Sequence, residues 1–598
     1  MTSTETDLRA ADVAWDLEPL VDGRGEGGVE ALLDEAEALV TRIVERRGTV
    51  AGLDADGLAA LMRDVAALHE RIGRAGSYAG LRFAEDTADP TRGALVQRTE
   101  TRAGMLGSEL VFVELEWLEV DDDRADALLA DERLAFCAHH LRTVRASRPH
   151  RLGEEAEQVD IQRSLTGVSA WGRLFDELTS AIRTDLDGED APLELALSRL
   201  SHPERPVRAA AAAAVTAALE PGLRTRAFVF NTVIADGATT DRLRAFPSWV
   251  SSRNLANEAS DASVQALVDA VVARYDIPQR WYALKARLLG VERLADHDRS
   301  ASVASSEARF GWNESRELVL DAFASYSPEL ASVAGRFFEE GWIDAPLRPA
   351  KRGGAFCAYT VPDVHPFLLL NWTSTRRDVL TLAHELGHGL HAYLARHQGV
   401  FHQSTPLTLA ETASVFGETV TFGRILEGTT EPAERLALLA ENIDGQVATV
   451  FRQVAMNRFE DAVHTHHRER GELSVEEFGE HWAATQTAML GDAVEVTEGY
   501  RTWWSYIPHF IHTPGYVYAY AYGQLLALSV YRRYREQGEA FVPAYLEMLA
   551  AGGSMPPEAL GRIVGCDLAD PSFWDGGLTI IDEQLRLTEQ AAHDAGRL

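Results

Sequence analysis

The sequence predicts a mostly α-helical protein with one small β-hairpin or sheet, and three observations lead to this prediction. Long segments rich in Ala, Leu and Glu place apolar residues at helical spacing, and short runs containing Gly, Pro or Asp separate them. A strand-like pattern is confined to short stretches. No period of about 20 to 50 residues repeats, so a solenoid of repeated units is not expected. At 598 residues the chain is too long for one small core, so we expect several domains or one subdivided helical body.

The first third of the chain is expected to consist of helical hairpins. A Gly-rich break precedes a helix predicted over residues 29–47, and a second helix follows over 55–83. A third helix is predicted over 91–120, with Asp89 as its cap and Pro90 in its first turn.

A small β-hairpin is expected next, because residues 181–197 place a DG turn between alternating residues. We put a domain boundary at this hairpin. It divides the chain into an N-terminal helical domain, 1–190, and a C-terminal domain, 191–598.

The C-terminal part begins with further helices. One contains six consecutive alanines, 209–214, which we assign to close helix packing because alanine is small and strongly helix-forming. Helical segments are also predicted at 281–289 and 307–340, the second interrupted by a turn at Ser327 and Pro328.

Charge and composition exclude several kinds of partner. The formal net charge of −34 repels polyanions, so neither a nucleic acid nor an anionic membrane is expected to bind. The N-terminus lacks the pattern of a signal peptide, and no apolar run approaches about 18 residues. Cys137, Cys357 and Cys566 are too scattered for a disulfide framework or a C-x-x-C site. A cytoplasmic protein is expected, and the oligomeric state stays open.

The segment 380–393, LTLAHELGHGLHAY, contains an H-E-x-x-H motif within a helical pattern. On a helix, His384, His388 and His391 lie within about 60° of one another, and apolar residues fill the opposite side. Two imidazoles at i and i+4 can converge on one cation, and Glu385 lies where it could hold a water bound to that cation. A buried helix whose histidines are satisfied by hydrogen bonds is the structural alternative.

A catalytic zinc site needs a third protein ligand. The metzincin pattern would require histidine where the chain has Leu394, so that class is excluded. A second helix is predicted over 405–428, with Thr405 as cap and Pro406 in its first turn. This helix places Glu411, Ser414 and Glu418 on one face.

An antiparallel pairing of these two helices would bring a carboxylate to the histidines. The helix end lies about 15 Å beyond the histidines, Glu411 lies about 8 Å into the returning helix, and the loop can absorb the difference. The predicted ligands are His384, His388 and Glu411, which leave a fourth position for water. Glu418 is expected either to orient a ligand histidine or to be a satisfied buried carboxylate. His391 is expected either to support the ligands or contact the substrate, or to have a structural role.

The stretch 351–372, KRGGAFCAYTVPDVHPFLLLNW, interrupts the helical pattern and predicts two short strands just before the motif. An edge strand there could pair with an extended peptide through backbone hydrogen bonds. We assign Gly353, Gly354, Ala355 and Phe356 either to substrate binding or to the support of the residues that contact the metal and the substrate. A plain structural hairpin is the alternative.

Several motifs occur together in one order: KRGGAF, HPFLLLNW, HELGH, ETASVFGE, TVFRQ in a helix at 449–453, and IPHF followed by clustered tyrosines. With them, residues 351–524 resemble the oligoendopeptidase F branch of the thimet-oligopeptidase-like zinc metallopeptidases. The resemblance implies a gluzincin-type helical body, similar to neurolysin, that encloses a deep substrate channel. One Zn²⁺ per chain would lie on the channel floor, residues 1–190 would cover the channel, and 191–598 would form the catalytic domain.

Residues 500–522 are dense in aromatic side chains, which by themselves indicate a buried aromatic cluster. In the family that the chain resembles, a histidine and tyrosines of this region donate hydrogen bonds to the oxyanion and the substrate backbone. The resemblance thus implies roles for His509, Tyr516, Tyr518 and Tyr520, with His512 as a second nearby histidine. We expect a glycine-bearing turn that leads into a helix here.

Together these observations predict a zinc-dependent endopeptidase that hydrolyses internal bonds of short oligopeptides with metal-activated water. Glu385 would act as the base, and His509 with one or more tyrosines would stabilise the oxyanion. Two alternatives stay open: a zinc carboxypeptidase of related fold, and a catalytically inactive, peptide-binding helical protein.

Overall fold

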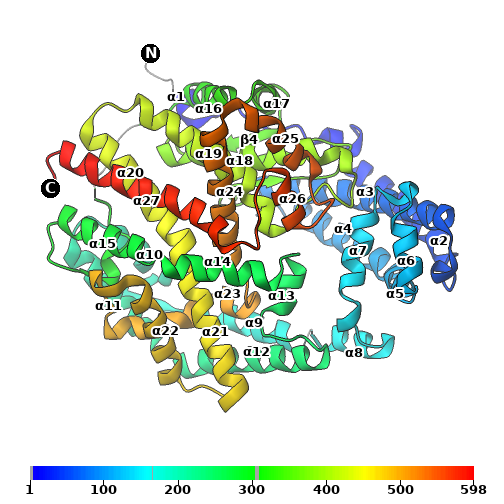
Figure 1. Cartoon of the computed structure of the whole chain (residues 1–598), viewed down its shortest axis with the longest axis horizontal. Helices are drawn as coiled ribbons and strands as arrows, with labels where there is room; N and C mark the ends of the chain where they lie inside the picture. Colours follow the sequence, from blue (N-terminus) through cyan, green and yellow to red (C-terminus); the bar gives the residue numbers. More distant parts are fainter. Residues whose placement is uncertain (1–4, 165, 304–308) are drawn as a thin grey trace. The chain divides into compact units, whose positions relative to one another are not determined.

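The computed structural model describes residues 5–164, 166–303 and 309–598, and it is mostly helical with small β-sheets (Figure 1). The chain divides into two compact units, each assembled from three separate segments. The first unit comprises Met1–Arg148, Glu307–Glu427 and Arg533–Cys566, and the second comprises Pro149–Ser306, Gly428–Arg532 and Asp567–Leu598. The boundary at residue 190 stays a prediction.

The N-terminal part of the first unit consists of packed helices, with α2 lying along both α3 and α4. Asp89 caps α4 by accepting from the Thr91 N–H, and Pro90 occupies the first turn, as predicted. The prediction of one helix over 91–120 is wrong, because α4 ends at Ser108 and α5 begins at Val111. Gly107 weakens the helix there, and the Ser108 hydroxyl bonds back to the Met105 carbonyl. The helices are α1 (Glu5–Arg9), α2 (Glu26–Val44), α3 (Ala55–Glu85), α4 (Pro90–Ser108), α5 (Val111–Leu118), α6 (Asp122–Leu129) and α7 (Ala138–Ala146).

The rest of the first unit contains a three-stranded sheet followed by two long helices. The turn predicted at Ser327 and Pro328 is confirmed, and the predicted start of that segment, 307–308, lies outside the described residues. The two strands predicted within 351–372 are also confirmed. A third strand, β4, belongs to the same sheet. Sequence reasoning missed it because a four-residue strand ending in proline carries little signal. The elements are α16 (Trp312–Tyr326), α17 (Pro328–Glu339), β4 (Ile343–Pro346), β5 (Phe356–Ala358), β6 (Phe367–Trp372), α18 (Arg376–Ala395), α19 (Leu407–Gly428), α25 (Val542–Ala551) and α26 (Pro557–Ile563).

The sheet of the first unit has the order β4-β6-β5, with β4 parallel and β5 antiparallel to β6. In this sheet β5 therefore lies at the edge, and Cys357 pairs with Leu368 of β6. Trp15, Phe367 and Leu369 are buried in one hydrophobic cluster beneath the sheet. This packing fixes the strand that leads directly into α18.

The second unit is built from helices with two two-stranded sheets. The predicted hairpin is confirmed: β1 pairs with β2, and the turn residues Asp187 and Gly188 have φ of 59° and 87°. The alanine-rich helix is α11, and α20 lies beside α27 although they are distant in sequence (Figure 1). The elements are α8 (Glu154–Ser164), α9 (Val168–Ser180), β1 (Arg183–Leu186), β2 (Glu189–Pro192), α10 (Leu193–Ser198), α11 (Arg205–Leu219), α12 (Leu223–Leu243), α13 (Ser251–Ala256), α14 (Asp261–Ala273), α15 (Asp276–Leu288), β3 (Leu294–Ala295), α20 (Pro432–Gln446), α21 (Gln453–Arg470), α22 (Val475–Leu490), β7 (Val494–Glu495), α23 (His509–His512), α24 (Tyr518–Gln537) and α27 (Pro571–Asp594).

An aromatic core supports α23 in the second unit. The ring of Phe510 lies parallel to that of Phe230, with centroids 5.8 Å apart, and Phe478 stacks on Trp504 at 4.6 Å. Because Phe510 is the second residue of α23, this core also holds the neighbouring His509 in place.

The three cysteines are free, and no helix in the described part of the chain is long and apolar enough to cross a membrane.

Candidate metal centre

The H-E-x-x-H motif lies on α18, a half-buried helix with a well-capped N-terminus. Thr375 caps it in a reciprocal capping box with Asp378. Val379, Leu382 and Leu386 are fully buried, so their helix face packs into the core. Their spacing leaves the histidine face of the same helix free to hold a ligand.

Two glycines allow α19 to approach α18 closely. A Cβ atom on Gly387 would lie 2.3 Å from the Ala413 carbonyl oxygen, and one on Gly417 would lie 2.9 Å from the Ala383 carbonyl oxygen. Only glycine fits at such backbone contacts. The pairing of 387 with 413 and of 417 with 383 shows that the two helices run antiparallel, as predicted.

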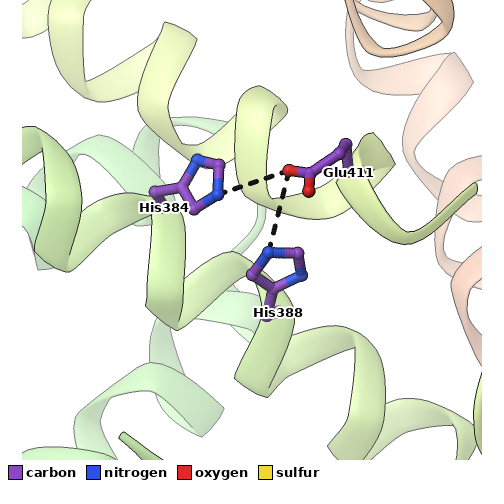
Figure 2. Close-up of side chains that lie close together, drawn as sticks. All are labelled: His384, His388 and Glu411. Atoms are coloured by element: carbon purple, nitrogen blue, oxygen red, sulfur yellow. Dashed lines mark ion pairs between the residues drawn. The ribbon is translucent and has the colours of Figure 1, made fainter. Parts of the chain in front are cut away.

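The close packing brings one carboxylate oxygen between two imidazoles (Figure 2). Glu411 Oε2 lies 3.3 Å from His384 Nε2 and 3.7 Å from His388 Nε2. Two ligand atoms at zinc-binding distance from one tetrahedral ion are about 3.3 Å apart, so the three residues fit around a single zinc ion. Within the described ranges, they are the group of His, Cys, Asp or Glu side chains that is arranged to hold a metal.

The electrostatics keep Glu411 ionised. Burial would raise its pKa, but the hydrogen bond and charge of His384 and the charge of His388 outweigh burial and lower the pKa to about 2. The Ser414 hydroxyl donates to Glu411 Oε2 over 2.8 Å, which fixes the carboxylate. Burial lowers the pKa of His388 to about 4, which keeps its imidazole neutral. Metal binding requires an ionised Glu411 and a neutral His388, whereas His384, whose pKa is raised, must lose a proton to bind a metal.

Glu418 lies behind His384, on the side of the ring away from Glu411. The His384 Nδ1 atom lies 3.2 Å from Glu418 Oε2, so the imidazole is held between two carboxylates. Burial lowers the pKa of His384, but Glu411 and Glu418 raise it to about 10. Of the two expectations for Glu418, this placement favours the one in which it orients a ligand histidine.

The motif glutamate, Glu385, is almost completely buried, with 7% of its surface exposed. Burial raises its pKa to about 7, against the opposing charge of His384 and with a further increase from Glu411. A hydrogen bond from the Cys357 backbone partly offsets the shift and links the carboxyl group to the edge strand β5. A carboxyl group with a pKa near neutrality can accept and return a proton at working pH.

His391 lies one turn beyond His388 and is buried. Its Nδ1 atom has no hydrogen-bond partner among the described residues, and burial lowers its pKa to about 3. This environment favours a neutral packing role over contact with a substrate.

The residues assigned to peptide contact lie on the edge of the sheet. Gly353 and Gly354 are exposed, and Ala355 and Phe356 are half buried at the start of β5. Asn371 of β6 donates to the Gly354 carbonyl over 2.8 Å, which holds the segment against the neighbouring strand.

Residues 500–522, called the tyrosine segment below, belong to the second unit. The predicted turn into a helix is confirmed, because Gly515 has a φ of 73° and α24 begins at Tyr518. His509 Nε2 lies 3.2 Å from the Tyr520 hydroxyl, and the Tyr516 ring is parallel to the His509 ring at 6.3 Å.

Two other residues predicted for this site are engaged elsewhere in the second unit. Tyr518 is fully buried, and its hydroxyl accepts from the Asn257 side chain over 2.9 Å. His512 is half exposed and pairs with Asp176 of α9 over 2.7 Å.

Sequence reasoning missed three residues near the centre. Gly387 and Gly417 set the helix spacing, and the available signal was the cost of glycine inside a helix. Tyr359, just after β5, was also missed. Burial and the charges of Cys357 and Glu411 raise its pKa, which shows that its hydroxyl lies in the field of the site. No sequence pattern distinguishes it from a packing tyrosine.

Comparison with known proteins identifies the family. The family model "Peptidase family M3" matches residues 320–579, and the model "Oligopeptidase F" matches residues 116–183. The first match contains both ligand helices and the tyrosine segment.

Curated relatives and solved structures agree with these matches. Oligopeptidase PepF of Bacillus subtilis is 25% identical, over 87% of this chain and 79% of its own length. Group B oligopeptidase PepB of Streptococcus agalactiae is 25% identical, over 87% of both chains.

The same fold occurs in two solved structures. A protein from Chlamydophila abortus has a TM-score of 0.86 at 22% identity, over 96% of this chain and 98% of its own. Oligoendopeptidase-F from Enterococcus faecium has a TM-score of 0.70 at 21% identity, over 95% and 99%. The chain belongs to peptidase family M3, on its oligoendopeptidase F branch, and is a metalloendopeptidase.

Proposed function

We propose that this protein is a zinc-dependent endopeptidase that hydrolyses internal peptide bonds of short oligopeptides. The observation that carries the proposal is the convergence of His384, His388 and Glu411 at spacings that fit one tetrahedral zinc ion. The oligopeptidases among the curated relatives support the substrate class.

His384, His388 and Glu411 would hold the zinc ion, and Glu418 would orient His384. When bound, zinc supplies a Lewis acid that polarises the scissile carbonyl and lowers the pKa of a coordinated water. Glu385 would take the proton of the attacking water and return a proton to the leaving amine. Burial raises the pKa of Glu385 in the metal-free site, which favours a carboxyl group that can accept a proton and return it.

The negative charge that develops on the carbonyl oxygen needs hydrogen-bond donors. We assign this role to His509 and Tyr520, whose polar atoms lie 3.2 Å apart, and to the neighbouring Tyr516. Tyr518 has a structural role in this proposal, because its buried hydroxyl is already bonded to Asn257. His512, which pairs with Asp176, is likewise not assigned to the reaction.

The substrate would bind in an extended conformation against β5. An edge strand offers free backbone groups to any peptide sequence, and Gly353–Phe356 lead into this strand. The channel implied by the family resemblance would exclude folded proteins. A cytoplasmic location would suit the three free cysteines.

Replacing Glu385 with Gln tests the mechanism. We expect kcat on an internally quenched oligopeptide to fall about 10²- to 10⁴-fold, with zinc content and melting temperature unchanged. Glu427→Gln, an exposed carboxylate at the end of α19, is the matched control and should cleave like the wild type. Full turnover by Glu385→Gln would contradict the mechanism.

Mass spectrometry of early products separates the alternatives. Internal cuts, made before any stepwise loss of C-terminal residues, are expected of an endopeptidase. Stepwise C-terminal release would indicate a carboxypeptidase. Zinc-loaded protein that binds peptides without cleaving them would indicate an inactive binding protein.

A further inference from the structure

A buried carboxyl group on α21 has no role in the chemistry described so far. Glu460 is fully buried, and its Oε1 atom accepts a hydrogen bond from the Gly515 backbone N–H over 2.8 Å. Its Oε2 atom has no hydrogen-bond partner among the described residues. A buried carboxyl group with one unpaired oxygen is unfavourable for stability, so its presence requires a reason.

The acceptor oxygen of Glu460 holds a tight turn between α23 and α24. Gly515 has a φ of 73°, a conformation that favours glycine. A Cβ atom there would lie 3.2 Å from Val250 Cγ2 and 3.3 Å from the Trp249 ring. Arg253 Nε also lies 3.4 Å from the Pro514 carbonyl oxygen. The turn is therefore enclosed on one side by Glu460 and on the other by residues 249–253.

This turn decides whether His509 and Tyr520 meet. The two residues lie on successive helices, and the chain must reverse between them at 513–516. In the observed conformation the His509 Nε2 atom and the Tyr520 hydroxyl are 3.2 Å apart, and the rings of Tyr516 and Tyr520 pack edge to face at 5.2 Å. A rotation at Gly515 would swing α23 relative to α24 and separate the pair.

We propose that Glu460 is a positioning residue for peptide hydrolysis: by fixing Gly515, its Oε1 atom keeps His509 and Tyr520 aligned as a preformed hydrogen-bonded pair. This inference rests on the proposed function, because it assigns the pair to the oxyanion. Donors fixed before the reaction need no reorganisation when charge develops, which is why their alignment affects rate more than binding.

The protonation of Glu460 agrees with this role. Burial raises its pKa to about 8, while the Gly515 hydrogen bond and the charge of Arg253 act in the opposite direction. At neutral pH the group is a neutral acid whose carbonyl oxygen accepts from Gly515. Glutamine offers the same acceptor and methionine does not, so these two substitutions separate the acceptor from the size of the side chain.

The test compares kcat and KM of Glu460→Met, Glu460→Gln and Tyr520→Phe with those of the wild type, on the same quenched peptide. We expect Glu460→Met to lower kcat at least about tenfold with KM within about threefold, and Glu460→Gln to stay within about threefold of the wild type. If Glu460 acts through Tyr520, the double variant Glu460→Met with Tyr520→Phe should be no slower than Tyr520→Phe alone. Wild-type kcat in Glu460→Met, or losses that multiply in the double variant, would overturn the proposal.

Two further measurements keep the proposal testable if a variant is unstable or the wild type is inactive. Gly515→Ala leaves Glu460 intact but crowds Val250 and Trp249, and it should reproduce the loss in kcat.

NMR titration of the His509 imidazole needs no activity. Burial and the charge of His512 lower the pKa of His509, and we expect the titration midpoint to move in Glu460→Met.

The matched control for the titration is Asp241→Asn, which removes another buried carboxyl that pairs with Arg468 near the end of α21. It should leave the His509 midpoint unchanged. An unmoved midpoint in Glu460→Met would refute the positioning role whatever the activity, whereas a wild type that cleaves no peptide would refute only the proposed function.

Discussion

The ligand helices of the first unit and the tyrosine segment of the second unit bring polar groups together by different means. On α18, His384 and His388 are neighbours because the helix repeats every 3.6 residues, and α19 adds Glu411 through backbone contact at Gly387. His509 and Tyr520 lie on two helices joined by a glycine turn, and the Gly515 N–H in that turn donates to Glu460 on a third helix.

The difference teaches where each arrangement is vulnerable. The ligand helices depend on the space between two backbones, so an added methyl group should be the most damaging change there. The arrangement of the tyrosine segment depends on individual hydrogen bonds, so removing a single oxygen atom should be enough to disrupt it. The predictions below test this contrast, from the largest expected effect to the smallest.

Gly387→Ala should weaken zinc binding by separating α18 from α19. The added Cβ would lie 2.3 Å from the Ala413 carbonyl oxygen, so α19 must move away and carry Glu411 with it. We expect zinc affinity to fall at least about 100-fold and the free energy of unfolding to fall by about 1–3 kcal/mol. Competition with a chromogenic chelator and thermal unfolding measure the two effects.

Gly423→Ala is the matched control, because it lies within α19 with nothing within 4 Å of the added atom. It should keep wild-type zinc affinity and gain up to about 1 kcal/mol of stability. If both alanine variants bind zinc equally well, backbone contact does not set the site.

Tyr520→Phe and Tyr518→Phe should separate catalysis from stability within the tyrosine segment. Loss of the Tyr520 hydroxyl should lower kcat by about 10²-fold, because an oxyanion donor is removed. Loss of the Tyr518 hydroxyl removes one hydrogen bond from the buried Asn257 amide and should reduce the free energy of unfolding by about 0.5–1.5 kcal/mol, with little change in kcat. The reverse pattern in steady-state kinetics and chemical denaturation would show that the assignment is exchanged.

Glu418→Gln should have a smaller effect on the ligand helices. The amide can still accept from His384 Nδ1, but without a negative charge to strengthen the imidazole as a ligand. We expect the zinc dissociation constant to rise about tenfold with the fold unchanged. Glu418 is partly exposed, not buried, and an unaltered constant would show that it does not orient His384 as a ligand.

Lowering the pH should reduce the free energy of unfolding of the second unit because of His464. This residue is buried on α21 and stacks on Trp249 at 4.5 Å. Burial lowers its pKa to about 3, whereas the unfolded chain has the ordinary value of about 6.5. The unfolded state therefore binds more protons between these values, and stability falls as pH decreases through this window. Between pH 6.5 and 4.5 the contribution is about 2–3 kcal/mol, and denaturation of His464→Phe should show a correspondingly flatter pH dependence.

Much of the ligand site could be predicted from the sequence because it depends on helical period. The i, i+4 histidines and the returning helix with Glu411 follow from spacing alone, and the structure brings these residues together. The short β4 and the break between α4 and α5 could not be predicted, since each depends on local bonds and tertiary partners rather than on a pattern.

The tyrosine segment shows the limit of such reasoning more clearly. Alternating tyrosines are compatible with several assignments, and the contacts of Tyr518 with Asn257 and of Tyr520 with His509 distinguish the two. Glu460 could not be found either, because the residue that it holds lies 55 positions later in the chain.

The central claim is that His384, His388 and Glu411 hold one zinc ion while Glu385 remains free to act as the base. The most direct measurement is zinc content and zinc affinity for the wild type, Glu411→Gln and Glu385→Gln, purified in parallel. We predict one zinc per chain in the wild type and in Glu385→Gln, and at least about 100-fold weaker binding in Glu411→Gln. Wild-type zinc affinity in Glu411→Gln, or loss of zinc in Glu385→Gln, would contradict the account.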